Sequence, residues 1–218
     1  VHFEHQFEKV KDIELRAGII HYELFLRYYV NALAYAKFPY CMHTVGSSMT
    51  VRADIYALSG GMNRRKAGED FYFLHELAPH EKRIQVNKAT VFPSPRLSDR
   101  VPFGTGKAQS DWMQGKAAHQ AVYHPQIFRD LKKLLEGKDR LYQDAEQFSS
   151  PHAWGKLFPE TVRLFLEESG FEKRLKGMLT NTASLAAFQK QFFLWLDGFR
   201  ALKFVHFCHQ THYTALPL

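Results

Sequence analysis

Two adjacent acids, Glu69 and Asp70, directly follow Gly68 and stand at the head of an apolar segment, residues 71–77. Glycine lets a backbone turn without a steric penalty, and the apolar spacing predicts a short helix that begins here. A carboxylate near a helix N-terminus is stabilised in its charged form by the helix dipole, unless burial raises its pKa more strongly. Asp70 is therefore a candidate general base. The side chains expected on the buried side of this helix are Phe71, Tyr72, Phe73, Leu74 and Leu77.

The same two acids also fit an ordinary, solvated helix start. The glycine-rich runs that precede them, residues 46–49 and 60–62, favour the catalytic interpretation. Glycine allows a backbone to come close to a ligand, so a carboxylate that follows such runs is presented in a way typical of an active site.

Four segments together resemble a known family. Residues 46–52 (GSSMTVR), 60–62 (GGM), 68–70 (GED) and 93–106 (PSPRLSDRVPFGTG) are similar, in order and spacing, to the acceptor-side half of bacterial family 2 glycosyltransferases. These are inverting enzymes of the GT-A fold that use nucleotide sugars. The resemblance covers roughly residues 1 to 110 and implies a hexosyltransferase-like activity in the synthesis of cell-envelope polysaccharide or glycolipid.

The resemblance also implies roles for individual residues. Asp70 is the base that removes the proton of the acceptor hydroxyl, and Glu69 orients the acceptor or neighbouring groups. Gly46, Ser47 and Ser48 let the backbone approach the donor sugar or the acceptor, with the two hydroxyls free to hydrogen-bond either. A tight strand end is the alternative for these three residues.

Three further positions join the expected substrate-binding set. Gly61 belongs to it through the resemblance of residues 60–62. Arg96 and Arg100, four residues apart in a proline-rich stretch, suit a clamp on a diphosphate or a phosphorylated acceptor, because guanidinium groups bind phosphate in a bidentate way. Pairing of these arginines with Asp99 or other surface acids is the competing interpretation.

Enzymes of this family normally begin with a nucleotide-binding half that ends in an Asp-x-Asp metal motif. No Asp-x-Asp occurs in the 218 residues, and the chain starts at Val1. We therefore expect a fragment that is inactive by itself. A divalent metal, Mg or Mn, and a nucleotide sugar are expected in the full-length enzyme, and none is expected to bind this fragment alone.

Composition indicates a folded protein of a reducing compartment. Hydrophobic residues make up 45% and charged residues 23% of the chain, which suits a core and a soluble surface. Cys41 and Cys208 do not form a disulfide framework. The first residues do not look like a signal peptide, and no run of about 18 apolar residues predicts a spanning helix. We expect a cytoplasmic location, at the inner face of the cytoplasmic membrane.

The chain is basic, with a formal net charge of +7. Such a charge attracts phosphate on nucleic acid, on lipid headgroups or on a sugar diphosphate. The Lys and Arg residues are scattered along the chain and accompany no nucleic-acid motif, so we expect no nucleic-acid partner. Peripheral contact with an anionic membrane and binding of a phosphate-bearing acceptor stay open. The sequence does not predict the oligomeric state.

The pattern predicts a mainly helical α/β protein. We expect a strand at 1–5, a helix at 8–38 that Pro39 ends, a strand at 44–52, a helix at 53–58 and a strand at 84–91 that leads into a proline-rich loop. The resemblance implies that residues 1–123 form a partial GT-A-like sheet with packed helices, and the pattern predicts that 124–218 form a C-terminal helical region. The apolar positions that recur with helical spacing in the first long helix are Ile13, Ala17, Ile20 and Leu24, and those of the C-terminal region are Phe128, Leu131, Leu134, Leu135, Val162, Phe165, Leu166, Phe188, Phe192, Trp195, Phe199 and Leu202.

Two other motifs are compatible with a phosphate-binding or a metal-binding site. Residues 104–107 (GTGK) look like a phosphate-binding loop but lack its first glycine and its final Ser or Thr, so they are not a Walker motif. His206, His209 and His212 fall at intervals of three, which is compatible with metal binding, although one helix rarely supplies a full set of ligands. Whether they bind metal stays open.

Two functions of different classes remain. The first is the acceptor-binding and catalytic-base portion of an inverting glycosyltransferase. The second is a non-catalytic helical module that docks a partner or a membrane on a glycosyltransferase-like scaffold. They differ at Asp70, because only the first requires its carboxylate.

Overall fold

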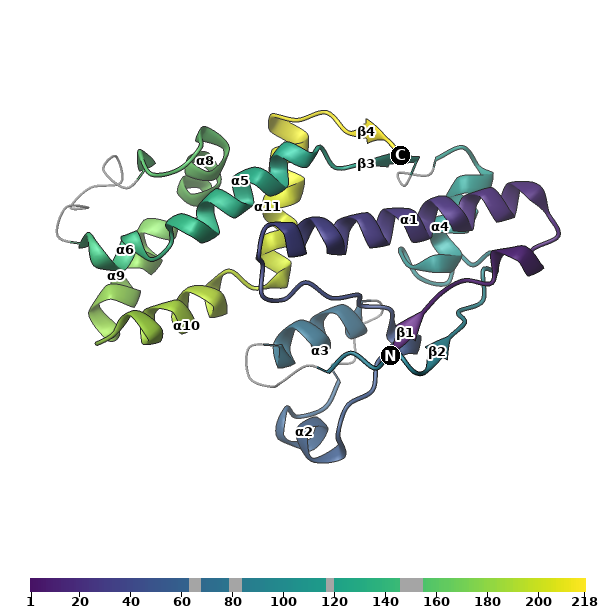
Figure 1. The fold of residues 1–218 in the computed structure, drawn as a ribbon, viewed down its shortest axis with the longest axis horizontal. Helices are drawn as coiled ribbons and strands as arrows, with labels where there is room; N and C mark the ends of the chain where they lie inside the picture. The colour runs from purple at the N-terminus through teal and green to yellow at the C-terminus, as the bar shows by residue number, and fades with distance from the viewer. Residues whose placement is uncertain (63–67, 79–83, 117–119, 146–154) are drawn as a thin grey trace. The chain divides into compact units, whose positions relative to one another are not determined.

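The computed structural model describes residues 1–62, 68–78, 84–116, 120–145 and 155–218. The chain is mainly helical, with two very small sheets (Figure 1). It divides into two compact units. Unit 1 comprises Val1–Val30, Met42–Val122 and Leu216–Leu218, and unit 2 comprises Asn31–Cys41 and Tyr123–Ala215. Among the described residues, no helix combines the length and the apolar character needed to cross a membrane.

Unit 1 contains the segments that carry the candidate site. Its elements are β1 (His2–Phe3), η1 (Phe7–Lys9), most of α1 (Ile13–Tyr35), η2 (Gly46–Ser48), α2 (Ala53–Leu58), α3 (Glu69–Leu77), β2 (Thr90–Val91), α4 (Thr105–Met113), β3 (Ala121–Val122) and β4 (Leu216–Pro217). β1 pairs in parallel with β2, His2 opposite Thr90, whereas β3 pairs antiparallel with β4.

The first long helix is shorter than predicted at both ends. Asp12 precedes it, and its Oδ1 accepts the backbone N–H of Leu15 at 3.0 Å, which caps the first turn. The helix ends at Tyr35, and Lys37 then adopts a left-handed conformation with φ of 60°. The chain therefore leaves the helix before Pro39.

Both longer strands predicted for unit 1 are wrong. Residues 44–52 form η2 and irregular backbone, because the Ser48 side chain turns back and donates to the Val45 carbonyl at 2.9 Å. Of residues 84–91 only Thr90–Val91 is a strand, and Ile84 is 80% exposed. Ile84 and Val86, within the predicted strand, are both exposed in the structure.

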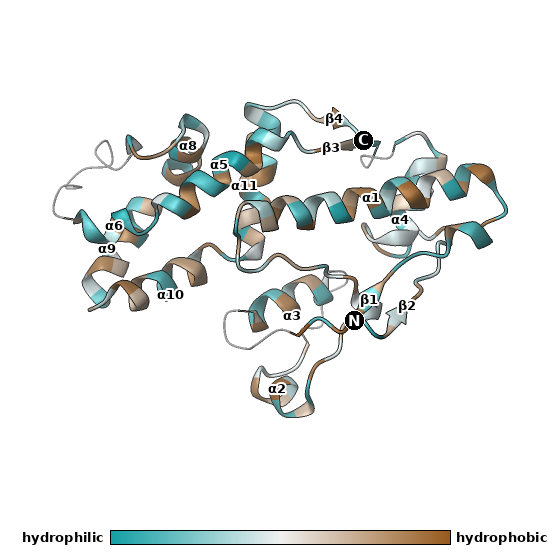
Figure 2. Cartoon of the chain, in the orientation of Figure 1, coloured by the Kyte–Doolittle hydropathy of each residue, from teal (hydrophilic) through white to brown (hydrophobic). Residues whose placement is uncertain are grey.

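Unit 2 is built from the end of α1 and six further helices of the described chain: α5 (Pro125–Gly137), α6 (Arg140–Gln143), α8 (Glu160–Glu168), α9 (Phe171–Asn181), α10 (Leu185–Trp195) and α11 (Gly198–Thr211). Hydrophilic and hydrophobic residues alternate along α5, as Figure 2 shows. The apolar positions predicted on α5 and α8 are buried, which confirms those two faces.

The aromatic stripe of residues 188–202 belongs to two helices, not one. Phe188, Phe192 and Trp195 are buried on α10, which confirms that they pack in the core. The chain then breaks, and Asp197 caps the next helix by accepting the backbone N–H of Arg200 at 2.7 Å. Phe199 and Leu202 therefore belong to a second helix, α11, which begins at Gly198.

A buried carboxylate lies in unit 2. Asp130 is 2% exposed and accepts hydrogen bonds from the Thr161 hydroxyl at 2.6 Å, the Tyr213 hydroxyl at 2.7 Å and the Gln126 side chain at 2.9 Å. These bonds tie α8 and the residues after α11 to α5. They satisfy a charge that would otherwise be costly to bury. The negative charge also helps burial to raise the pKa of the Cys208 thiol to about 12.

Candidate functional site

α3 presents the two acids in its first turn, as the sequence predicted. It is preceded by Gly68, which is buried and has φ of 74°. The positive φ favours glycine, and a Cβ on Gly68 would lie 3.0 Å from the Phe103 ring, which would have to move slightly. Of the five apolar residues expected on the buried side of α3, only Phe73 is buried. Its ring packs edge-on against Tyr56 of α2 and anchors the helix.

Asp70 lies against Gly46, 24 positions earlier in the sequence. The backbone N–H of Gly46 donates to the Asp70 carboxylate. A Cβ added to Gly46 would come within 2.6 Å of Asp70 Oδ2, so a larger residue would displace the carboxylate. The structure therefore brings together two members of the predicted site, and it gives Gly46 a reason to be glycine.

The electrostatic surroundings of Asp70 differ from the sequence expectation. Burial raises the pKa of its carboxyl above the ordinary value, and the neighbouring charge of Glu69 adds to this. The N–H groups of Phe71, at 2.7 Å, and of Gly46 oppose the shift but do not cancel it. Desolvation therefore raises the pKa of Asp70 more than its position at the start of a helix lowers it. Among the described residues, no lysine or arginine forms an ion pair with Asp70.

Tyr22 of α1 is a neighbour of Asp70 that sequence reasoning missed. Burial and the negative charge of Asp70 raise the pKa of the Tyr22 hydroxyl to about 12, so this group keeps its proton near neutral pH. No spacing relates Tyr22 to Asp70, which is 48 positions further along the chain. The association depends on how α1 and α3 pack, and periodicity does not report that.

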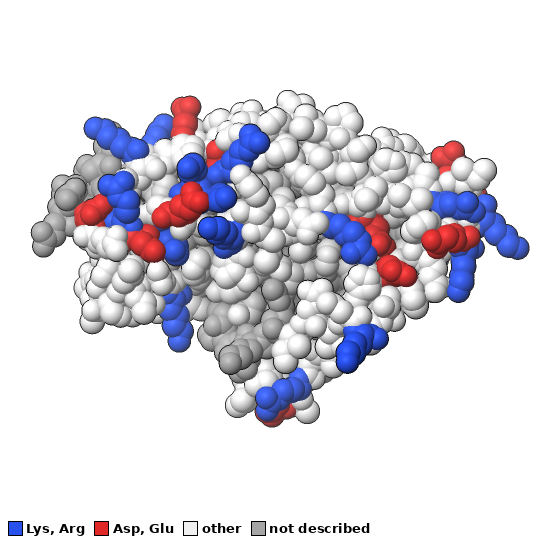
Figure 3. All heavy atoms as spheres, in the orientation of Figure 1, with Lys and Arg blue, Asp and Glu red and all other residues white. Residues whose placement is uncertain are grey.

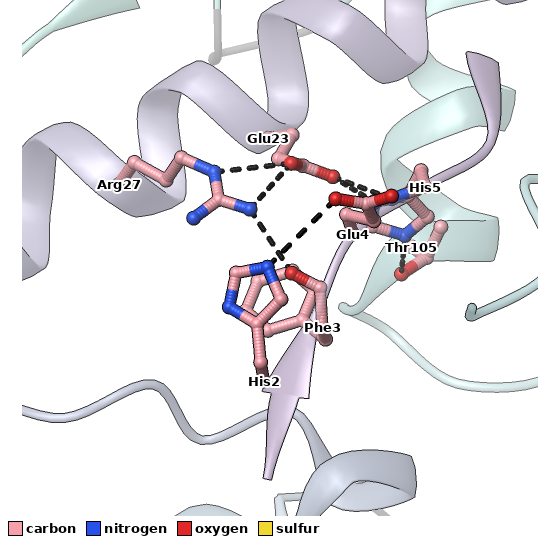
Figure 4. A network of polar contacts seen from close by, with 7 residues as sticks. All are labelled: His2, Phe3, Glu4, His5, Glu23, Arg27 and Thr105. Carbon is pink, nitrogen blue, oxygen red and sulfur yellow. Dashed lines mark hydrogen bonds and ion pairs between the residues drawn. The ribbon is translucent and has the colours of Figure 1, made fainter. Parts of the chain in front are cut away.

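A polar network on α1 holds the start of the chain, as Figure 4 shows. Glu23 accepts both the backbone N–H of His5 and a bond from its ring Nδ1, each at 2.7 Å. Arg27 donates to the other Glu23 oxygen at 2.6 Å and to the Phe3 carbonyl at 3.0 Å. The second ring nitrogen of His5 lies 3.5 Å from the Thr105 hydroxyl at the start of α4.

This network fixes the charge of Glu23. Burial alone would raise the pKa of its carboxyl, but the bonds from His5 and Arg27 outweigh burial and lower it to about 2. The ionised Glu23 joins β1 to α1, and His5 adds a contact to α4. The Glu23 and Arg27 spacing of four was visible in the sequence, whereas the partnership with His5 was not.

The remaining glycine and serine candidates lie close by but differ in accessibility. Ser48 is buried, and its hydroxyl donates within η2, so it supports the turn. Ser47 is exposed and lies next to Gly46. Gly61 has φ of 78° in the turn after α2, and a Cβ there would lie 3.2 Å from the Tyr56 ring. Gly61 therefore shapes the turn beside the ring that packs on Phe73.

Arg96 and Arg100 are both exposed. Their loop is held at two points: Gln109 of α4 donates to the Pro95 carbonyl at 3.2 Å, and the backbone N–H of Ser98 donates to Gly106 at 3.1 Å. The rival interpretation paired these arginines with Asp99. In the structure Asp99 lies 3.7 Å from Lys107 instead.

α4 is an element that the sequence analysis did not predict. Residues 104–107, set aside as a failed phosphate loop, open this helix. Gly106 is needed because a Cβ there would come within 2.5 Å of Ser98. Gln109 is fully buried and also donates to the Leu15 carbonyl of α1 at 2.8 Å. Gly106 thus allows the loop that carries Arg96 and Arg100, called the arginine loop below, to pack against α4.

The acids and histidines that the structure describes do not gather into a metal site. In the ranges that the structure describes, no group of three or more His, Cys, Asp or Glu side chains could hold a metal ion. This includes His206, His209 and His212 on and after α11. His206 instead lies 2.9 Å from the Tyr123 hydroxyl. The described residues therefore offer no ligand set for Mg or Mn.

The site can thus offer a half-buried carboxylate with a raised pKa, beside a glycine backbone and a protonated tyrosine. Such a group suits proton abstraction from a hydroxyl near neutral pH. Two exposed arginines lie on a loop whose end, Phe103, contacts the residue before α3. No family model, curated protein or solved structure matches the chain.

Proposed function

We propose that unit 1 is the acceptor-binding and catalytic-base part of an inverting glycosyltransferase that uses a nucleotide sugar. The observation that carries the proposal is the position of Asp70: half-buried in the first turn of α3, against Gly46, with a raised pKa and no ion pair to a described Lys or Arg. A solvated pair of helix-start acids would have neither the burial nor the contact with Gly46.

In the proposed reaction the acceptor hydroxyl attacks the anomeric carbon of the donor sugar. Asp70 takes the hydroxyl proton as the new C–O bond forms, and the bond from the anomeric carbon to the nucleotide diphosphate breaks with its electrons. The configuration inverts because attack and departure occur on opposite faces. Glu69, one residue away, orients the acceptor and raises the pKa of Asp70 through its charge.

The base must be ionised to accept a proton, so transfer should increase with pH through the pKa of Asp70. Because this pKa is raised, the rising limb should lie at higher pH than for an ordinary aspartate. Arg96 and Arg100 are exposed, which supports a role in binding the diphosphate of the donor or a phosphorylated acceptor.

The wider assignment follows from the sequence resemblance. We propose that β1, β2 and their helices belong to a GT-A-like layer of a longer enzyme, which also supplies the Mg or Mn site and most contacts to the nucleotide. The activity would serve cell-envelope polysaccharide or glycolipid synthesis at the cytoplasmic face of the membrane. On the face drawn in Figure 3, Lys and Arg side chains are interspersed with acids.

The test is Asp70→Asn in the full-length protein. We expect it to lower the rate of sugar transfer by about 100-fold or more, because a positioned general base contributes about 10²–10⁴ in rate. Glu69→Gln is the matched control and should cost less. The fold of both variants is checked by amide NMR spectra.

The outcome also separates this proposal from the alternative of a non-catalytic docking module on the same scaffold. A docking module does not need the carboxylate, so Asp70→Asn would leave its function unchanged. Full transfer activity in the Asp70→Asn enzyme would overturn the proposed role.

A further inference from the structure

An exposed aromatic ring lies at the start of α3, contributed by a distant part of the chain. Phe103 ends the arginine loop, and its ring atoms would lie 3.0 and 3.3 Å from a Cβ on Gly68. Tyr72, one turn into α3, approaches the same point at 3.8 Å. Gly68 is followed immediately by the two acids, so the ring belongs to the surroundings of the proposed site.

The ring is exposed on one side and lies close to Gly68 on the other. Phe103 is 52% exposed, and one part of it packs on Gly68. The next residue, Gly104, has φ of 95° and caps α4, so the start of that helix determines the direction of the chain. The Ser98 and Gln109 bonds hold the rest of the loop.

We propose that the acceptor is itself a carbohydrate and that its sugar ring packs on Phe103; this inference rests on the proposed function of Asp70. A pyranose has one apolar face of C–H groups and an edge of hydroxyls. The aromatic face suits the C–H groups, and carboxylates accept hydrogen bonds from hydroxyls. Apolar contact with a few convergent polar groups is the usual composition of a small-molecule site.

Other ligand classes fit this surface less well. A phosphate alone gains nothing from an aromatic ring, and the negative charges of Glu69 and Asp70 repel it. A lipid chain gains nothing from the two carboxylates. A sugar ring uses both features at once, and it brings a hydroxyl near the group that would remove its proton.

The inference is tested first on the 218-residue chain by ligand-observed NMR, with cellobiose and N-acetylglucosamine as probes and glycerol as the control solute. We expect saturable binding in the millimolar range, with the largest saturation transfer to the C–H protons of one sugar face. Phe103→Ala should weaken the signal at least fivefold. Phe92→Ala removes another exposed phenylalanine of unit 1 and should leave it unchanged.

Unaltered binding in folded Phe103→Ala, or no binding to the wild-type chain, would overturn the inference. In the full-length enzyme, Phe103→Ala should raise the KM for a sugar acceptor about tenfold and leave the KM for the donor unchanged, while Phe103→Tyr should restore the acceptor KM. An unchanged acceptor KM in Phe103→Ala, with Asp70→Asn inactive, would remove this inference and leave the proposed function intact. If the enzyme transfers no sugar, the NMR result still decides whether Phe103 binds one.

Discussion

The two units treat their apolar side chains in opposite ways. Of the 29 buried hydrophobic residues in the described chain, 25 belong to unit 2; the four in unit 1 are Phe3, Ile19, Phe73 and Val122. Of the 14 large hydrophobic residues that are exposed in the described ranges, 13 belong to unit 1, and Tyr35 is the single described one in unit 2. Unit 2 encloses a core of its own, whereas unit 1 leaves most of its large apolar side chains in contact with water.

The two units therefore differ in what stabilises them and in the chemistry that they can perform. A closed core of packed aromatic helices makes unit 2 sensitive to loss of volume. Unit 1 instead relies on polar links, such as the Glu23 network, and on close backbone approaches at Gly46 and Gly68. It also carries every residue of the proposed site. The following substitutions test this contrast.

The largest effect on stability should come from the core of unit 2. Phe192→Ala removes a fully buried ring that contacts Phe171, Phe188 and Trp195. We expect a loss of about 3–5 kcal/mol in the free energy of unfolding, measured by urea denaturation. Leu58→Ala in unit 1 is the control: at 83% exposed, it should cost less than about 0.5 kcal/mol. An equal loss of unfolding free energy in the two variants would contradict the difference between the units.

The next effect should come from Asp130. Its replacement by Ala leaves the buried hydroxyl of Thr161 and the partly buried hydroxyl of Tyr213 without their acceptor. We expect a loss of about 3 kcal/mol, since unsatisfied buried polar groups cost about 1–3 kcal/mol each. Tyr213→Phe removes one of the three bonds and should cost about 1 kcal/mol. A neutral Asp130→Ala variant would show that the network does not stabilise unit 2.

In unit 1, Glu23→Gln should cost about 2 kcal/mol at neutral pH, because it weakens charge-assisted bonds to His5 and Arg27. The folded-state pKa of Glu23 is about 2, below the ordinary 4.5. The unfolded state therefore binds this proton more readily, and the stabilisation is present above pH 4.5 and is lost as pH falls toward 2. Urea denaturation at several pH values measures it. The variant should lack this acid-dependent loss, and an identical pH profile would contradict the assignment.

The smallest effect should come from Gly46→Ala. Its methyl group meets Asp70 Oδ2, and rotation of the carboxylate should relieve the clash at a cost of about 1 kcal/mol. Gly177→Ala in α9 is a matched control, since nothing lies within 4 Å of its added Cβ. Alanine favours a helix there, so stability should rise by about 0.5–1 kcal/mol. A Gly46→Ala variant as stable as wild type, with Asp70 undisturbed, would show that the two residues are not in contact.

The same contrast explains what the sequence could predict. On α5, Phe128, Leu131 and Leu134 follow helical spacing and are buried, because other helices of unit 2 cover them. On α1 the same logic selected Ile13 and Leu24, which are exposed, whereas the buried hydrophobic residues of this helix are Ile19 and Leu33. Periodicity identifies an apolar face, but it does not supply a partner for that face.

The candidate site was partly predictable. The glycine and acid runs identified Gly68, Asp70 and Gly46. A positive φ or a close backbone approach favours glycine, and glycine can be recognised in the sequence. The electrostatic effect of Asp70 on Tyr22 and the closeness of Gly68 and Phe103 depend on how distant segments come together, and no local pattern in the sequence reveals them. Asp130 does carry a signal in the sequence, because it is a charged residue within the apolar stripe of α5.

The most direct test of the account is a ¹³C NMR titration of the Asp70 carboxyl in the 218-residue chain. We predict a pKa above the ordinary value of 3.8. We also expect Glu69→Gln to lower it toward that value, because the substitution removes a neighbouring negative charge. A pKa of Asp70 at or below 3.8, unmoved by Glu69→Gln, would contradict the claim that this carboxylate is held half-buried to take a proton.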